Sequence, residues 1–272
     1  MIHRCRFKWG GGLADGEYQI VYNFFRTLRS LLDEFSPKKV YFPLDGKPKK
    51  RVEAYDEYKA NRKVDLDDPE VAEYWASFHR QKRIIINSLK ENYPITTVYH
   101  PDYECDDLIL HLIKNVIPED ENVVIVSSDT DFIQIINNYN NVSLYNPVST
   151  EFREKTEYDY VAWKAMVGDK SDNIHGIKGI GVKTAQKILM NGELESRLKS
   201  SEFKQIYEKN YDLIRLHDLS EEDKLSITYS KSAALEREVI EKEFIEMNFL
   251  SLLKEQTLEK YFNTFESIGK DQ

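Results

Sequence analysis

The sequence predicts an α/β fold: a mostly parallel central sheet flanked by helices, followed by a helical C-terminal region. Three observations lead to this prediction. Short apolar runs alternate with amphipathic segments over residues 17–145, residues 157–260 have an almost wholly helical pattern, and acidic strings directly follow several of the apolar runs. Alternating strands and helices build a parallel sheet with helices on both faces. We therefore expect an α/β domain over residues 1–156 and a helical domain over residues 157–272.

A glycine-rich turn at residues 10–12 is the first predicted feature. A helix follows over residues 17–35, because apolar residues recur there every three or four positions and Ser36-Pro37 ends the pattern. The apolar run at residues 40–44 predicts a short buried strand. Each of these elements places one apolar face or run toward a core.

Residues 47–73 are charged and lack a stripe of apolar residues, so we expect an excursion from the core with partial helix. The other elements of the first domain are, in order, a helix over 74–93, a strand over 94–99, a helix over 106–116, a strand over 123–126, a helix over 131–137 and a strand over 142–145. In the helical region we expect breaks at Gly192 and at residues 220–224. The apolar stretch at residues 243–262 predicts a core helix, with docking of a partner as the minority interpretation.

The composition indicates a soluble globular protein. Of the 272 residues, 41% are hydrophobic and 31% are charged, which excludes global disorder. No run approaches the ~20 apolar residues that a membrane span needs, and the N-terminus lacks the apolar core of a signal peptide. The two cysteines, Cys5 and Cys105, exclude a disulfide scaffold and a cysteine-rich zinc site. A cytoplasmic location is the expectation.

The charge is unevenly distributed along the chain. The net charge of −9 argues weakly against nucleic-acid binding. However, residues 47–63 carry seven basic and three acidic side chains, a local net of +4, and residues 164–187 carry five lysines and two aspartates, a local net of +3. We give this pattern more weight than the total, so nucleic acid stays among the expected partners.

Acidic residues follow the predicted strands or open the next helix. The candidate metal ligands are Asp45, Glu104, Asp106, Asp107, Asp129, Asp131, Asp169 and Asp172. Ligand sites in open α/β sheets lie beyond the carboxyl ends of the strands, so we expect most of these residues to converge on one edge. Each cluster taken alone also has a structural interpretation, since Asp is common in turns and at helix N-caps. Their recurrence beside basic segments favours the functional interpretation.

Eight carboxylates in one pocket repel one another unless counter-charge is present. Mg²⁺ takes oxygen ligands and keeps several waters. Two such ions ~4 Å apart can clamp a phosphodiester, one by activating a water and the other by stabilising the leaving oxygen. The acidic clusters therefore predict a two-metal site for phosphodiester hydrolysis.

The string GIKGIG, followed by VKTAQKIL, predicts a helix–hairpin–helix motif at about residues 165–190. Glycine supplies the backbone freedom that such a hairpin needs, and the N–H groups at the start of its second helix suit phosphate. The candidate DNA-binding residues here are Gly176, Lys178, Gly179, Gly181, Lys183 and Thr184. The alternative is a plain helical turn with solvated lysines. A hairpin of this kind contacts the DNA backbone without sequence preference.

The motifs together resemble the 5′-nuclease family. In order, the strings are DGK, YKANR, YECDD, SSDTDF and GDKSDNIHGIKGIGVKTA. This family covers phage 5′–3′ exonucleases, flap endonucleases and the 5′-nuclease domain of bacterial DNA polymerase I. The resemblance spans roughly residues 1–190, and the last 80 residues carry little of it.

The resemblance implies roles for the acidic residues. Asp45, Glu104, Asp106 and Asp129 would hold the first of two Mg²⁺ or Mn²⁺ ions, and Asp131, Asp169 and Asp172 would surround the second. Asp107 would lie near both, through water. The hairpin would hold duplex DNA, often with a monovalent cation such as K⁺ on its carbonyls.

The resemblance also implies DNA contacts. The string YKANR resembles the base of a helical arch that a single-stranded 5′ end threads, with Lys59 and Arg62 on the scissile phosphate and Lys164 as a further candidate. Tyr58, with its neighbour Tyr55, could stack on bases or serve in packing. Arg4, Lys47 and Lys49 complete the predicted contacts. The alternative for the arch is a solvated charged loop, with residues 47–51 as ordinary surface charge.

One departure from the family concerns the start of the sequence. Family members begin with an apolar strand that carries a metal-binding aspartate, whereas this sequence opens at the segment HRCRF that would follow that strand. We expect the true start to lie upstream. The alternative is a variant with an impaired site.

These observations predict a structure-selective, sequence-independent 5′ nuclease that acts as a monomer on flap, nicked or RNA-primed duplex DNA during replication. A polymerase or a single-strand-binding protein is the expected protein partner. One alternative is a junction-binding protein without turnover. Another is a PIN-class ribonuclease, against which the hairpin argues.

Overall fold

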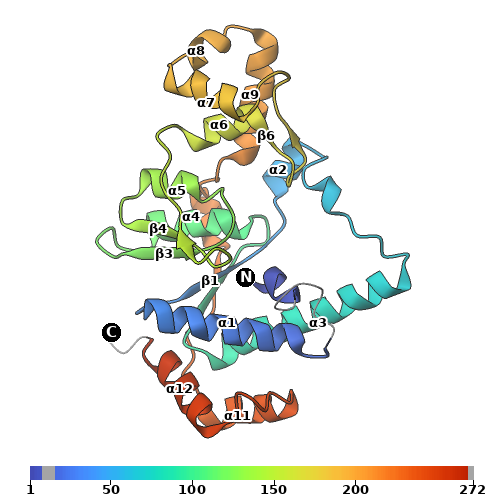
Figure 1. The fold of residues 1–272 in the computed structure, drawn as a ribbon, viewed down its shortest axis with the longest axis vertical. Helices are drawn as coiled ribbons and strands as arrows, with labels where there is room; N and C mark the ends of the chain where they lie inside the picture. Colours follow the sequence, from blue (N-terminus) through green and yellow to red (C-terminus); the bar gives the residue numbers. More distant parts are fainter. Residues whose placement is uncertain (8–15, 269–272) are drawn as a thin grey trace. The chain divides into compact units, whose positions relative to one another are not determined.

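A computed structural model of the chain describes residues 1–7 and 16–268 (Figure 1). It contains two compact units, and each is assembled from separated stretches of sequence. Unit 1 comprises residues 1–44, 64–99 and 227–272, and unit 2 comprises residues 45–63 and 100–226. The predicted division at residue 156 stays a prediction. The predicted glycine-rich turn at residues 10–12 lies outside the described residues.

Unit 1 packs helices around one apolar core. Its elements are η1 (Ile2–Arg6), α1 (Gln19–Phe35), β1 (Tyr41–Leu44), α3 (Pro69–Asn92), β2 (Thr96–Tyr99), β8 (Thr228–Tyr229), α11 (Arg237–Glu246) and α12 (Glu255–Glu266). The apolar face of α1, with Phe24 and Phe25 fully buried, packs against Phe78 of α3 and Tyr261 of α12. The predicted helix over residues 17–35 is therefore confirmed, with its predicted apolar face inward.

The helix α3 begins five residues before the predicted start at residue 74. The Asp68 carboxylate accepts the N–H groups of Glu70 at 2.9 Å and Val71 at 3.4 Å, and Pro69 occupies the first helical position. Both features favour helix initiation. The buried side chain of Gln81, on α3, caps the start of α1, because its amide oxygen accepts the Ile20 N–H at 2.8 Å.

Unit 2 contains the remaining elements. They are α2 (Lys49–Ala54), η2 (Ala60–Arg62), α4 (Cys105–Asn115), β3 (Val123–Val126), α5 (Ile133–Asn138), β4 (Val142–Asn146), β5 (Glu151–Phe152), α6 (Tyr160–Val167), β6 (Gly168–Asp169), β7 (Ile174–His175), α7 (Val182–Met190), α8 (Leu194–Arg197), α9 (Ser201–Ile214) and α10 (Glu221–Leu225). One apolar cluster joins α6, α7 and α9, and a second lies between α5 and the strands β3 and β4.

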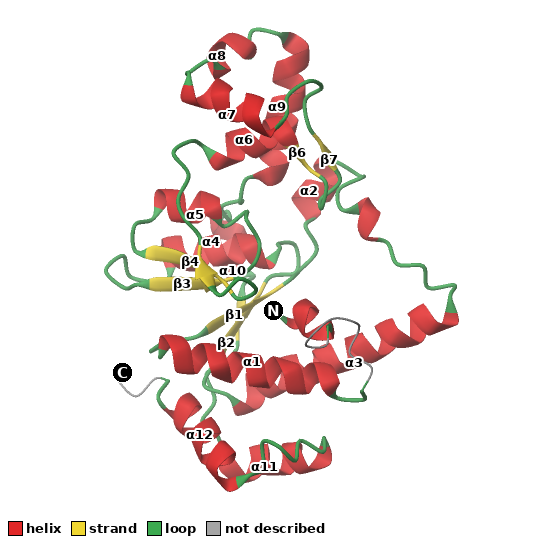
Figure 2. Cartoon of the chain, viewed as in Figure 1, coloured by secondary structure: helices red, strands yellow, loops and turns green. Residues whose placement is uncertain are grey.

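The strands of the described residues lie in two three-stranded sheets and one two-residue ladder (Figure 2). In unit 1 the order is β1-β2-β8, with β1 parallel to β2. In unit 2 it is β3-β4-β5, with β3 parallel to β4 in the register Val123↔Val142. The predicted parallel pairing is present. It is divided between two sheets, each with a short antiparallel strand at one edge.

Two predictions for the helical region are wrong. The predicted break at residues 220–224 is the helix α10, because the Ser220 hydroxyl caps it and three acidic residues occupy its first turn. The predicted single helix over residues 243–262 is two helices. Asn248, with a φ of 59°, adopts the left-handed conformation just after α11, and the Phe249 N–H returns to the Phe244 carbonyl at 2.8 Å. No helix in the described part of the chain is both long and apolar enough to cross a membrane.

Candidate metal and nucleic-acid site

Three side chains of unit 2 form the centre of the site. The carboxylate oxygens of Asp131, Asp169 and Asp172 lie within 4.8 Å of one another. Asp131 comes from the loop between β3 and α5, Asp169 is the last residue of β6, and Asp172 lies in the turn that joins β6 to β7. Lys164 of α6 donates to Asp131 and, at 2.6 Å, to Asp169. The Ser171 N–H and hydroxyl both donate to Asp169 at 2.7 Å, so the turn fixes this carboxylate in place.

Further carboxylates crowd this group. Burial and the charge of Asp129 raise the pKa of Asp106 to about 7. Burial, with the charges of Asp129 and Asp169, raises the pKa of Asp131 to about 6 although the Lys164 ammonium lowers it. Burial is the larger cause of each shift and the neighbouring carboxylates add to it, so both disfavour the anionic form. An all-oxygen set of this kind has the chemistry that Mg²⁺ or Mn²⁺ requires, so the residues fit such ions.

The remaining predicted ligands gather at the start of α4. Glu104 precedes the first residue of this helix, and the Asp45 carboxylate accepts the Cys105 N–H at 3.2 Å. The charges of Asp129 and Glu104 both act on Asp106. The predicted convergence of the acidic clusters from the loops after β3, before α4 and between β6 and β7 is therefore present within unit 2.

The YKANR segment folds directly onto the acidic turn between β6 and β7. The Arg62 guanidinium donates to Asp172 at 2.6 Å and to the Ser171 carbonyl at 3.1 Å. The Asn61 side chain donates to the Lys170 carbonyl at 2.8 Å. The Lys59 ammonium contacts Glu104 and, at 3.6 Å, Asp172. Residues 59–62 are therefore held by specific bonds to this turn, although Asn61 and Arg62 are exposed, and the predicted role of the segment in an arch stays a prediction.

Tyr58 lies between two of the carboxylates. Its hydroxyl donates to Glu104 and to Asp172, at 3.0 Å in each case. The side chain belongs to the apolar cluster of α6, α7 and α9 and is 7% exposed. A ring that is buried cannot stack on a base, so the structure favours the packing interpretation over the predicted base contact.

Asp107 differs from the other predicted ligands. Its two oxygens accept hydrogen bonds from both terminal nitrogens of Arg51, at 2.7 and 2.8 Å, and one of them also accepts the His217 N–H at 2.8 Å. Asp107 is 1% exposed and Arg51 5% exposed. Arg51 and the backbone thus already engage its carboxylate, and the predicted position of Asp107 near both metals through water stays a prediction. Arg51 was not among the predicted residues, since in the sequence it ends a run of surface lysines.

The helix–hairpin–helix prediction is confirmed as a structure between α6 and α7. Ile177 and Ile180 pack against the apolar cluster beneath it. Gly179 has a φ of +82°, which favours glycine. A Cβ on Gly176 would lie 2.1 Å from the Val167 carbonyl oxygen, so only glycine fits there. Lys178, Lys183, Gly181 and Thr184 are all exposed around the hairpin.

Some predicted DNA contacts lie outside these groups. In unit 2 Lys47 is exposed just before α2 and Lys49 is exposed as its first residue, and Arg4 is exposed on η1 of unit 1. Their contact with DNA stays a prediction.

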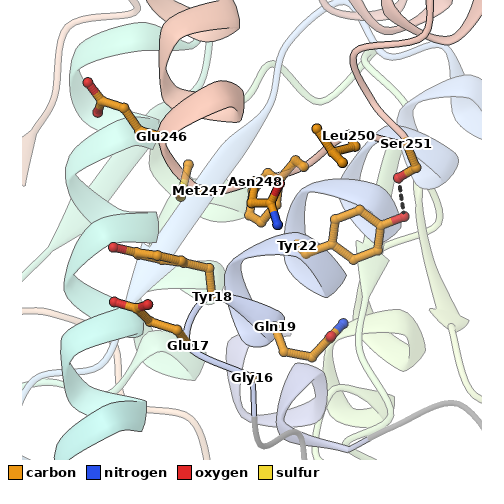
Figure 3. A pocket seen from close by; sticks show the side chains of 11 residues that line it. Gly16, Glu17, Tyr18, Gln19, Tyr22, Glu246, Met247, Asn248, Leu250 and Ser251 are labelled. Carbon is orange, nitrogen blue, oxygen red and sulfur yellow. Dashed lines mark hydrogen bonds between the residues drawn. The ribbon is translucent and has the colours of Figure 1, made fainter.

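Unit 1 has a groove of a different character (Figure 3). It is lined by the start of α1 and by the segment that follows α11, with Tyr22 bonded to Ser251 at 2.9 Å. Its ionisable side chains among the described residues, apart from tyrosine, are Glu17 and Glu246. Arg80 pairs with Glu17 at 3.8 Å. The groove therefore lacks the converging carboxylates that distinguish the site in unit 2.

Comparison with known proteins places the chain among nucleases. Residues 12–167 match the family described as 5′-3′ exonuclease, N-terminal resolvase-like domain. The chain is 31% identical over 231 residues to a 5′-3′ exonuclease of Aquifex aeolicus, covering 75% of each protein. It is 35% identical over 193 residues to the thermostable DNA polymerase I of Thermus caldophilus, which is 67% of this chain and 22% of the polymerase. The chain thus spans about a fifth of the length of such polymerases.

Solved structures share the fold. The flap endonuclease D15 of bacteriophage T5, in a pseudo-enzyme–product complex with DNA and metal ions, aligns with a TM-score of 0.57 at 19% identity, over 71% of this chain and 79% of that one. The T5 5′-exonuclease with bound zinc aligns with a TM-score of 0.55 at 17% identity, over 92% and 91%. These likenesses confirm the predicted α/β nuclease fold.

Proposed function

The chain belongs to the 5′-3′ exonuclease family, and we propose that it is a metal-dependent 5′ nuclease that hydrolyses DNA phosphodiesters near junctions of single and double strands. The observation that carries the proposal is the meeting of the Asp131, Asp169 and Asp172 oxygens within 4.8 Å. Lys59 and Arg62 pair with Asp172, and Lys164 pairs with Asp131 and Asp169.

The ligand set divides into two groups that suit two Mg²⁺ or Mn²⁺ ions. We assign Asp45, Glu104, Asp106 and Asp129 to one ion, as the family resemblance implies, and the clustered Asp131, Asp169 and Asp172 to the other. When bound, such ions supply an activated water and charge neutralisation at the leaving oxygen. Lys164 holds two carboxylates of the second group at a fixed separation.

The cationic side chains have roles that their position supports. Lys59 and Arg62 lie against the carboxylates, and we infer that both turn to the phosphate when DNA arrives, stabilising the charge that develops on its oxygens. Arg62, with a side chain 54% exposed, has the freedom for this exchange. The two cations therefore link the substrate to the same carboxylates that hold the metal.

The hairpin supports recognition of duplex DNA by shape. Its exposed glycines and lysines precede and begin α7, where backbone N–H groups and the helix dipole favour a phosphate. Contacts of this kind fix position without reading sequence. A bacteriophage relative of this fold is a DNA complex and the Thermus relative is a polymerase, which supports removal of flaps or primers in replication as the cellular role. A hairpin that binds duplex DNA is also the argument against a PIN-class ribonuclease.

The test is cleavage of a 5′-labelled flap DNA by the purified chain, with Mg²⁺ and with a chelator. We expect cutting that needs the metal and that Asp129→Asn abolishes. Asp129 accepts the Asp131 N–H at 3.0 Å, and the asparagine oxygen retains this bond, so the loop keeps its fold. Flap binding without cutting by the unsubstituted chain would support the junction-binding alternative, and unchanged cutting by Asp129→Asn would refute the metal assignment.

A further inference from the structure

Arg51 is the most fully bonded charged side chain near the site. All five of its N–H groups have acceptors. The acceptors are Leu213 O at 3.0 Å, Arg215 O at 3.0 Å, Glu104 Oε2 at 3.1 Å, Asp107 Oδ2 at 2.7 Å and Asp107 Oδ1 at 2.8 Å. A planar guanidinium whose five N–H groups are all hydrogen-bonded is fixed in a single orientation. The guanidinium is therefore a rigid part of unit 2.

The acceptors belong to two separate parts of the unit. Glu104 and Asp107 lie at the N-terminal end of α4, whereas Leu213 and Arg215 lie at the C-terminal end of α9. The last carbonyls of a helix lack partners within the helix, and here the guanidinium supplies them. Arg51 thus fastens the start of α4, which carries candidate metal ligands, to the end of α9.

Asp107 completes this arrangement from the other side. It bonds bidentately to Arg51 and accepts the N–H of His217, in the segment after α9. The pair is almost wholly buried, and a buried charge needs a partner of the opposite sign with its remaining hydrogen bonds satisfied. Asp107 therefore neutralises Arg51, and its oxygens are already occupied by that task.

We propose that Arg51 is a positioning residue for metal binding, that it acts by orienting Glu104, and that Asp107 anchors Arg51 and is not itself a metal ligand. The inference rests on the proposed function. Glu104 receives a bond from the Arg51 fork on one oxygen, which it shares with the Tyr58 hydroxyl, and the Lys59 ammonium contacts its other oxygen. Arg51 thus orients one carboxylate oxygen of Glu104, while the other oxygen faces Lys59.

The test uses Arg51→Lys, which keeps the charge and loses the planar fork. We expect Mn²⁺ to bind the full chain about tenfold or more weakly in isothermal titration calorimetry without DNA, with the same number of ions, because partners of metal ligands typically have effects of this size. The Mg²⁺ concentration for half-maximal flap cleavage should rise in parallel. Arg197→Lys is the matched control, because Arg197 forms an exposed ion pair with Glu193 on α8. It should bind Mn²⁺ as the unsubstituted chain does.

Mn²⁺ titration of Asp107→Asn is the second, independent measurement. It replaces the first if Arg51→Lys melts below the assay temperature. As an anchor, Asp107 should leave the number of bound Mn²⁺ ions unchanged when substituted, with weaker binding. Loss of one ion, as expected for Asp129→Asn, would make Asp107 a ligand and overturn the inference. A lower melting temperature of Arg51→Lys with unchanged Mn²⁺ affinity would also overturn it, since Arg51 would then be merely structural. Failure of the unsubstituted chain to bind Mn²⁺ would instead refute the proposed function.

Discussion

The backbone N–H of Lys59 donates to the carbonyl oxygen of Asp172 at 3.0 Å. This bond joins two motifs that are far apart in the sequence, the basic YKANR segment and the acidic turn after α6. Lys59 has a φ of 56°, a left-handed conformation that costs a non-glycine residue about 1 kcal/mol. The surrounding bonds of Asn61 and Arg62 hold the segment in this conformation, and the ammonium of Lys59 is thereby directed at Glu104.

Lys59→Gly tests the role of the Lys59 ammonium separately from the role of its backbone conformation. Glycine adopts the left-handed conformation without cost, so we expect a melting temperature close to that of the unsubstituted chain. Loss of the ammonium should lower kcat for flap cleavage by about 10²–10³, the effect of removing one donor to a developing charge. Lys63→Ala, at an exposed neighbour outside the site, is the control and should keep its kcat. Equal kcat values for Lys59→Gly and the control would disprove a role for the ammonium.

Tyr58→Phe removes the hydroxyl that donates to Glu104 and Asp172 while the buried ring stays. We expect a loss of stability of about 1–3 kcal/mol, because two carboxylates lose a donor in a buried place. Urea unfolding measures this loss, and fluorescence anisotropy with a labelled flap DNA should give an unchanged affinity. Tyr55→Phe is the matched control, since the Tyr55 ring is less buried and its hydroxyl contacts Glu57 at 3.0 Å. A large drop in flap affinity for Tyr58→Phe alone would mean that the hydroxyl contacts DNA.

Gly179→Val tests the hairpin. The position has a φ of +82° and open space around it, so valine meets backbone strain without a clash. The hairpin should distort, and we expect about tenfold weaker binding to a duplex-bearing substrate with little change for a single strand. Gly192→Val is the matched control, because Gly192 has a φ of +69°, equally open surroundings and a place beyond the end of α7. Equal losses of duplex affinity in the two variants would assign the effect to general destabilisation.

Glu243→Gln gives a stability change with a defined pH dependence. Burial raises the pKa of Glu243, and Ser88 and Asn92 donate to it at 3.0 and 2.7 Å and oppose that shift. A carboxyl whose pKa is higher in the folded state favours folding while it is protonated and loses that contribution as the pH rises through the folded pKa. The substituted amide cannot ionise and keeps one oxygen acceptor. The variant should therefore melt above the unsubstituted chain at pH 7.5, with the difference shrinking toward pH 4. A constant difference across this range would contradict the prediction.

Local patterns determined much of the fold. The period of apolar residues located α1 with its buried face, and the uninterrupted run VVIV matched β3 with the predicted bounds. Glycine spacing located the hairpin. A side chain at Gly176 would clash with the Val167 carbonyl, and Gly179 has a positive φ that other residues rarely adopt. These features depend on periodicity, capping and φ preference over a few residues, so the sequence contains them directly. Where the predictions missed such signals, α3 was started too late after Asp68 and the helix α10, capped by Ser220, was taken for a break.

The sequence by itself thus determined the acidic and basic residue types of the candidate site and the family to which they belong. Only the tertiary structure decided which of those residues are buried and which partners each one bonds to. Arg51 stands in a run of lysines, yet it is buried while Lys50 is 52% exposed on its side chain. Asp107 and Asp106 are neighbours in one string, yet one bonds to Arg51 and the other faces Asp129. Contacts between residues 53 to 164 positions apart carry no local signal. They depend on which helix faces pack together, and this packing decides which carboxylate pairs with Arg51 and which carboxylates form the group that we propose to bind metal.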